Sequence, residues 1–211
     1  LFPYTTLFRS MQNYLRCIKG IDDNVGRLLD YLEENDLADN TIIVYMSDQG
    51  FFLGEHGWYD KRFMYEPSLR IPLLISWPDV TDKGSHSDLL VQNLDLAPTL
   101  LEIAGVEIPK RMQGQSMVPI LKGDATPWRD AMYYHYYEYP GAHSVQKHEG
   151  VRTERYKLIH YYEIDEWEMF DFKSDPNEMI NLYDNPAYAG IQNELNQKLK
   201  ALKVQYEVPS S

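Results

Sequence analysis

A polar loop between Ser47 and Arg62 holds the residues whose types and spacing could do chemistry. At its start, Asp48 and Gln49 both offer oxygen, the donor atom that hard cations such as Ca²⁺ and Mg²⁺ prefer. Adjacent strand residues point to opposite faces, so both side chains reach one ion only where the chain leaves strand geometry. Gly50 permits such a turn. The sequence therefore predicts Asp48 and Gln49 as metal ligands.

The same loop ends in two adjacent cations, Lys61 and Arg62, which could hold an anion beside the metal. His56 lies between the two groups, and a lone histidine is more often structural than catalytic. The alternative is an ordinary solvent-exposed loop in which Asp48 is a turn residue. The spacing across the whole loop is far more specific than any one of these signals. It continues as Phe63-Met64-Tyr65-Glu66 and then Leu69-Arg70-Ile71-Pro72-Leu73-Leu74.

Helical and strand patterns alternate around this loop. Apolar residues at helical spacing predict a helix over 11–35. The β-branched run 41–46 suits a strand buried on both faces, hence a parallel sheet. A second apolar run covers 71–77, and 95–105 is typical of a short helix with Asp95 as its N-cap. These steps predict a doubly wound α/β fold, in which ligands bind at the carboxyl ends of the strands.

The composition becomes aromatic and strand-like after Trp128. Neighbouring short strands favour antiparallel pairing, and a final helix begins near Asn185. The boundary therefore falls near residue 127, with part of an α/β domain over 11–127 and an α+β subdomain over 128–211. The expected strands of the subdomain are 132–139, 150–153, 156–161 and 168–172.

The first ten residues share no pattern with the rest of the chain. They lack the cationic region and the cleavage motif of a signal peptide. We interpret residues 1–10 as a non-native scar, with a genuine strand fragment from a longer protein as the alternative.

Composition excludes several classes of protein. The 211 residues carry a formal charge of −12, which argues against a nucleic-acid-binding surface. No run of about 18 apolar residues is present, so we expect no membrane-spanning helix. The single cysteine, Cys17, excludes an internal disulfide framework and a cysteine-rich zinc site.

The loop resembles the formylglycine-dependent sulfatase family of the alkaline-phosphatase-like superfamily. The matching text is Ser-Asp-x-Gly-x-x-x-Gly-Glu-His-Gly over 47–57, with Lys61 thirteen residues after Asp48. The resemblance covers about residues 11–207 and is closest to bacterial sulfatases that act on sulfated glycans. The tail is similar to the C-terminal domain of N-sulfoglucosamine sulfohydrolases. Supporting matches are Gly20-Ile21-Asp22-Asp23-Asn24-Val25-Gly26-Arg27, Asp95-Leu96-Ala97-Pro98-Thr99-Leu100, Gly150-Val151-Arg152-Thr153 and Tyr156-Lys157-Leu158-Ile159.

The resemblance implies the chemistry of the site. The family binds Ca²⁺ beside a formylglycine whose hydrate attacks sulfur. By resemblance, Asp48 and Gln49 occupy calcium-ligand positions, and Lys61 is the lysine that grips the sulfate and steadies the leaving oxygen. His56 is the second candidate catalytic residue, with a loop-shaping role as its alternative, and Arg62 is a candidate substrate-binding residue. The expected partner is a sulfated carbohydrate, and the full-length bacterial protein is expected in the periplasm or outside the cell.

The nucleophile of the family is missing from these residues. Formylglycine forms from Cys or Ser in a Cys/Ser-x-Pro-x-Arg motif, whereas Cys17 is followed by Ile18-Lys19-Gly20. Two candidate ligands also cannot fill a shell of six to eight oxygens. We therefore expect the nucleophile and further ligands upstream, and we expect this fragment to be inactive alone.

Two histidines of the subdomain, His143 and His148, lie five apart in a glycine-containing stretch. We predict a mobile loop in which either could contact sulfated glycan; a metal pair is the weaker alternative. Three functions stay open at this point: a carbohydrate sulfatase, a phosphate or phosphonate monoester hydrolase of the same superfamily, and a non-catalytic glycan-binding fragment.

Overall fold

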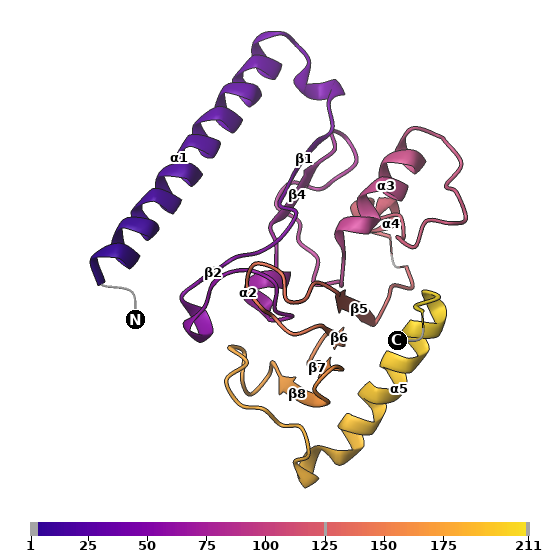
Figure 1. Cartoon of the computed structure of the whole chain (residues 1–211). Helices are drawn as coiled ribbons and strands as arrows, with labels where there is room; N and C mark the ends of the chain where they lie inside the picture. The colour runs from indigo at the N-terminus through magenta and orange to yellow at the C-terminus, as the bar shows by residue number, and fades with distance from the viewer. Residues whose placement is uncertain (1–3, 125, 210–211) are drawn as a thin grey trace. The chain divides into compact units, whose positions relative to one another are not determined.

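The computed structural model describes residues 4–124 and 126–209, with side chains from Phe8 onward (Figure 1). The chain forms two compact units, one of residues up to Met46 with Pro72–Thr81, the other of Ser47–Ile71 with Asp82 onward. The boundary predicted near residue 127 stays a prediction. None of the described helices is long and apolar enough to cross a membrane.

The first unit consists of one long helix and a two-stranded sheet. Helix α1 spans Tyr4–Glu34, so it begins ahead of the start predicted near Met11. A short 3₁₀ turn, η1 (Ala38–Asn40), leads into strand β1 (Ile43–Met46). Residues 1–3 lie outside the described part, and the interpretation of 1–10 as a scar stays a prediction. The exposed apolar side chains of α1 include Leu15, Ile18, Ile21, Leu28 and Leu29.

Strand β1 pairs with β4 (Leu73–Ser76) in antiparallel register, with Val44 opposite Ile75. The mixed α/β class is confirmed, but the parallel, doubly buried pairing predicted for this strand is wrong within the described residues. Tyr45 and Leu74 are both exposed. A run of β-branched residues signals a strand that favours burial, and it does not encode the direction of the partner strand.

The second unit contains the predicted antiparallel sheet. Its strands are β5 (Ala131–Tyr136), β6 (His148–Thr153), β7 (Tyr156–Tyr161) and β8 (Glu166–Asp171), hydrogen-bonded in that order. The 3₁₀ turn η4 (Pro186–Tyr188) precedes helix α5 (Ala189–Gln205). The strands and the final helix were therefore placed correctly from the sequence, within a few residues.

The two faces of this sheet bury different parts of the chain. Successive strand residues point to opposite faces, so neighbours such as Leu158 and Ile159 enter different clusters. On one face, Leu158 packs with Leu195 and Leu199 of α5. On the other face, Ile159 packs with Met64, which belongs to the loop segment before the short helix α2 (Glu66–Leu69). The loop is thus seated on the sheet, opposite α5.

The polar loop of this unit contains short elements of its own. Strands β2 (Phe52–Leu53) and β3 (Tyr59–Asp60) form a small antiparallel hairpin around the 3₁₀ turn η2 (Glu55–Gly57). Further along lie η3 (Asn93–Asp95), α3 (Leu96–Ile103) and α4 (Val118–Leu121).

Asp95 is the N-cap residue of α3, as the sequence predicted. Asp95 ends η3 in helical geometry, and its side chain makes no capping bond to α3. Its fully buried carboxylate instead accepts two hydrogen bonds from Arg129, one of them 2.6 Å from Nη2 to Oδ1. It also accepts from the backbone N–H of Gln115 at 2.8 Å and of Gln92 at 2.7 Å.

Candidate active site

The turn that carries the predicted metal ligands is fixed by close backbone contact. The N–H of Gly50 donates to the carbonyl oxygen of Ser68 at 2.8 Å. A Cβ at Gly50 would lie 2.1 Å from the carbonyl oxygen of Pro67, so only glycine fits. On the other side, the Asn93 side-chain amide donates to the carbonyl oxygen of Asp48 at 2.8 Å. The turn after β1 is therefore held from two directions.

Asp48 and Gln49 offer part of a hard-cation shell. The side chain of Asp48 is exposed, and its Oδ1 accepts a long hydrogen bond of 3.5 Å from the Ser47 hydroxyl. A carboxylate and an amide oxygen are suitable ligands for Ca²⁺. Among the described residues, no group of three or more His, Cys, Asp or Glu could hold a metal ion. The two residues fit a metal chemically, and the shell needs further ligands.

His56 shapes the hairpin turn. It adopts φ 55°, between Gly54 at φ 128° and Gly57 at φ 75°. Its half-buried ring packs against Tyr65, with centroids 4.6 Å apart, and edge-on against Phe52 at 6.2 Å. These contacts support the loop-shaping alternative, and a catalytic role for His56 stays a prediction.

Lys61 lies between two residues with unusual backbone geometry. Asp60 has φ 107° and Arg62 has φ 116°, a region that side chains other than glycine rarely adopt. Such strain persists only where the surroundings over-determine it, and it clusters at functional sites. Across residues 8–124 and 126–209, the half-buried Lys61 side chain has no hydrogen-bond or ion-pair partner. Its ammonium group is therefore available to an anion.

Asp60 joins the loop to the subdomain. Its Oδ2 lies 3.0 Å from Nη1 of Arg62 and 2.8 Å from Nε2 of His143. The structure thus brings together Arg62 and His143, two candidate substrate-binding residues. Asp60 was not predicted as a site residue from the sequence. Its position next to Lys61 gave no signal, because the pairing with His143 depends on a contact between distant parts of the chain.

The predicted loop position of His148 is wrong. His148 begins strand β6, and its side chain is completely buried. Its Nδ1–H donates to the carbonyl oxygen of Gln146 at 2.8 Å, while Nε2 has no partner among the described residues. The neighbouring rings are Phe63, Tyr134, Tyr136 and Tyr161, at centroid distances of 5.1 to 6.2 Å.

The surroundings of His148 also rule out the weaker alternative of a metal pair. His143 is bonded to Asp60, whereas His148 is enclosed by aromatic rings. Burial is the main influence on His148 and lowers its pKa to about 4, so the ring is neutral near pH 7. A residue without exposed surface cannot contact a glycan directly in this arrangement, which leaves His143 as the reachable histidine.

Comparison with known proteins identifies the family. Residues 54–205 match the family described as N-sulphoglucosamine sulphohydrolase, C-terminal. This match covers more than half of the chain, so the chain belongs to that family of sulfatase C-terminal domains. The resemblance of the loop to the sulfatase family is confirmed.

Individual relatives agree with this assignment. An N-acetylglucosamine-6-O-sulfatase of Bacteroides thetaiotaomicron is 54% identical over 201 residues, which is 93% of this chain and 36% of that protein. A solved protein in complex with its substrate D-glucosamine-2-N,6-O-disulfate is 53% identical with a TM-score of 0.91, covering 93% of this chain and 41% of that one. The chain thus spans about a third of the length of the curated relatives it matches.

A phosphonate monoester hydrolase of Agrobacterium radiobacter is a more distant structural neighbour. It is 25% identical with a TM-score of 0.81, covering 90% of this chain and 40% of that one. The fold is therefore shared with enzymes that act on a different anionic ester, and the fold alone does not define the substrate.

Proposed function

We propose that this chain is part of a sulfatase that hydrolyses sulfate esters, or N-sulfate, of carbohydrates such as glycosaminoglycans or mucin glycans. The observation that carries the proposal concerns Lys61. Its ammonium group has no partner among the described side chains, and the residues on both sides of it have strained backbone geometry. An available cation on a rigid loop suits the grip of a sulfate group. The 54% identical N-acetylglucosamine-6-O-sulfatase supports 6-O-sulfated N-acetylglucosamine as the first substrate to test.

Each residue has a defined task in this proposal. Lys61 binds a sulfate oxygen and stabilises the leaving oxygen as negative charge develops on it. Arg62 and His143, which meet at Asp60, contact the substrate beside it. Asp48 and Gln49 contribute oxygen ligands to Ca²⁺. The formylglycine of the family, expected outside these residues, supplies the nucleophile for attack at sulfur.

The proposal is tested with the full-length protein that contains this chain. We expect release of sulfate from 6-O-sulfated N-acetylglucosamine, loss of activity on treatment with EGTA, and recovery with added Ca²⁺. Recovery with Mg²⁺ alone would contradict the choice of metal. The isolated 211-residue chain should be inactive in the same assay. Absence of sulfate release from any sulfated saccharide would contradict the proposal.

The second candidate is a phosphate or phosphonate monoester hydrolase, favoured by the neighbour at 25% identity. The same assay with a phenyl phosphonate and an aryl phosphate separates the two. A kcat/KM for either that exceeds the value for the sulfated sugar would favour the second candidate. Binding of the sugar without hydrolysis by the full-length protein would favour a glycan-binding role.

We also propose a periplasmic or extracellular location, which fractionation of the producing bacterium tests.

A further inference from the structure

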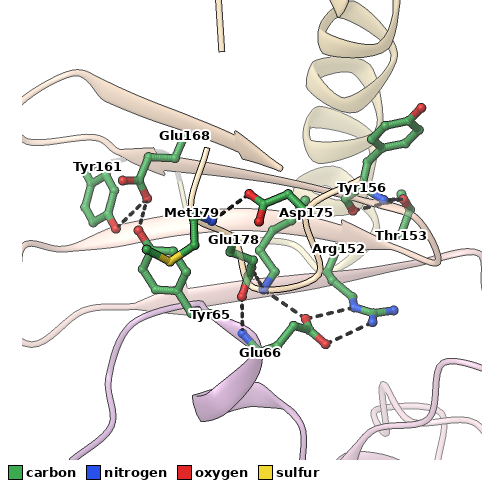
Figure 2. Close-up of polar contacts among 11 residues, drawn as sticks. Tyr65, Glu66, Arg152, Thr153, Tyr156, Tyr161, Glu168, Asp175, Glu178 and Met179 are labelled. Carbon is green, nitrogen blue, oxygen red and sulfur yellow. Dashed lines mark hydrogen bonds and ion pairs between the residues drawn. The ribbon is translucent and has the colours of Figure 1, made fainter. Parts of the chain in front are cut away.

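A buried group of four charges connects the loop to the four-stranded sheet (Figure 2). The Glu66 carboxylate lies 3.0 Å from Nζ of Lys157, and the same Nζ lies 2.5 Å from Oε1 of Glu178. Arg152 donates to both oxygens of Glu66, at 3.3 Å from Nε and 3.1 Å from Nη2. The second oxygen of Glu178 accepts the backbone N–H of Glu66 at 2.7 Å. We call these four residues the ionic cluster.

The ionic cluster is deeply buried and electrically balanced. The side chains of Lys157 and Glu178 are 0% and 1% exposed, and those of Glu66 and Arg152 are each 18% exposed. Burial opposes ionisation of Glu66, but Lys157 and Arg152 together lower its pKa below the ordinary value. Burial raises the pKa of Glu178 despite its contact with Lys157. Two carboxylates therefore face two cations in a space with little water.

Stability alone is a weak reason for such a cluster. The cost of removing charges from water often exceeds their mutual attraction, and well-packed apolar residues are commonly as stable. Charged groups with fixed partners define one arrangement of the segments that carry them. Here the arrangement joins Glu66, at the start of α2, to Arg152 of β6 and Lys157 of β7.

Other contacts hold the same segment to the same face of the sheet. The Tyr65 hydroxyl donates to Oε2 of Glu168 at 2.7 Å, and the Tyr134 hydroxyl donates to the carbonyl oxygen of Arg62 at 3.2 Å. Met64 is fully buried between these contacts. The segment from Arg62 to Glu66, directly after Lys61, is thus bonded to the sheet at both ends: through the carbonyl oxygen of Arg62 and through the side chain of Glu66.

We propose that Glu66 is a positioning residue, through which Lys157, Arg152 and Glu178 hold the loop so that Lys61 and Arg62 face the sulfate group. The strained backbone on both sides of Lys61 needs such support, because strain survives only in over-determined surroundings. The inference rests on the proposed function. It assigns the small sheet an indirect part in substrate binding: the cluster does not contact the substrate but holds the loop that does.

The test uses the full-length protein and two measurements: the Kd for inorganic sulfate by calorimetry, and kcat/KM for the sulfated sugar. We expect Lys157→Met to weaken sulfate binding about tenfold and to lower kcat/KM by about 100-fold, since small displacements of binding groups have effects of this size. The matched control is Asp171→Asn at the end of β8, which disrupts the 2.8 Å pair with Arg155 in the turn between β6 and β7. The control should lose thermal stability and keep the sulfate Kd.

A double variant, Lys157→Met with Glu178→Gln, separates positioning from stability. It restores the charge balance of the buried space, so the thermal midpoint should recover towards that of the wild type. If Glu66 acts by position, the sulfate Kd stays weakened after this recovery. A sulfate Kd within twofold of wild type in the folded double variant would overturn the inference. A wild-type protein that releases no sulfate would overturn the proposed function together with the inference, whereas an active wild type with unaffected variants overturns the inference alone.

Discussion

The side chain of Met64 lies directly against the backbone of Gly150. A Cβ at Gly150 would come within 2.4 Å of the Met64 sulfur and within 2.4 Å of the carbonyl oxygen of Leu158. Since both neighbours are buried, neither can yield without disturbing the loop or the strand pairing. Because residue 150 of β6 has no side chain, Met64 can pack against the strand and the loop can lie on the sheet.

Gly150→Ala should destabilise the full-length protein by about 1–3 kcal/mol, the usual cost of overpacking a filled core. It should also weaken sulfate binding, because Met64 is three residues after Lys61. Thermal unfolding measures the first effect and calorimetry the second. The control is Gly190→Ala in α5, where an added Cβ meets nothing within 4 Å. A Gly150→Ala protein as stable as this control would contradict the packing described.

Arg129→Met should destabilise the protein by about 3–5 kcal/mol, because it leaves the buried carboxylate of Asp95 without its charged partner. Denaturant unfolding followed by tryptophan fluorescence measures this loss. Lys198→Met provides the comparison, since Lys198 pairs with Asp130, whose side chain is 79% exposed. Exposed pairs contribute about 0–1 kcal/mol. Equal losses of unfolding free energy in the two variants would show that the buried Arg129–Asp95 pair contributes no more than an exposed pair.

His148→Phe should change how stability depends on pH. The pKa of His148 is about 4 in the folded protein and near 6.5 when exposed, so the unfolded chain binds more protons between these values. Stability of the wild type therefore falls as the pH drops from 6.5 to 4. The free energy of unfolding of the variant should not show this fall, which amounts to up to about 3 kcal/mol in the wild type. Denaturant midpoints across this pH range measure the difference, and parallel curves for the two proteins would refute it.

Lys61→Ala should abolish the grip on sulfate with little effect on folding. We expect kcat/KM to fall on the order of 100-fold, the usual effect of removing a group that stabilises developing charge. The thermal midpoint should stay within the range of a surface substitution, because Lys61 has no partner among the described side chains. Lys110→Ala, at an exposed position of the same unit, is the matched control for charge. Unchanged kinetics in Lys61→Ala would remove Lys61 from the proposed site.

The elements of the second unit were largely predictable from the sequence, because their apolar spacing is local. The alternation in β7 and the stripe in α5 both follow from which faces are buried. The direction of pairing between β1 and β4 was not predictable, since it depends on long-range contacts. His148 was misplaced for a related reason: the expected strand began at residue 150, whereas β6 begins at His148, which is enclosed by rings from distant parts of the chain such as Phe63.

The candidate site was predictable only in part. Loop spacing made Lys61 and Arg62 candidates, because both residues lie within one short stretch, and their roles stay predictions. The contributions of Asp60 and Glu66 were not predictable, because their partners lie far along the chain. Arg152 is 86 residues from Glu66, and Glu178 is 112 residues away. No short motif can encode a pairing over that distance.

The loop packs on strands that lie about 90 residues later in the sequence. During synthesis the loop is therefore made before the surface that holds it. Ribosomes extend the chain from its N-terminus, so Lys61 leaves the ribosome well before Lys157 and Glu178 exist. A nascent chain that ends before β7 contains Lys61 and Arg62, the proposed sulfate-binding residues, but lacks the sheet that positions them. Competence to bind sulfate would then arise only after the strands of the four-stranded sheet have been synthesised.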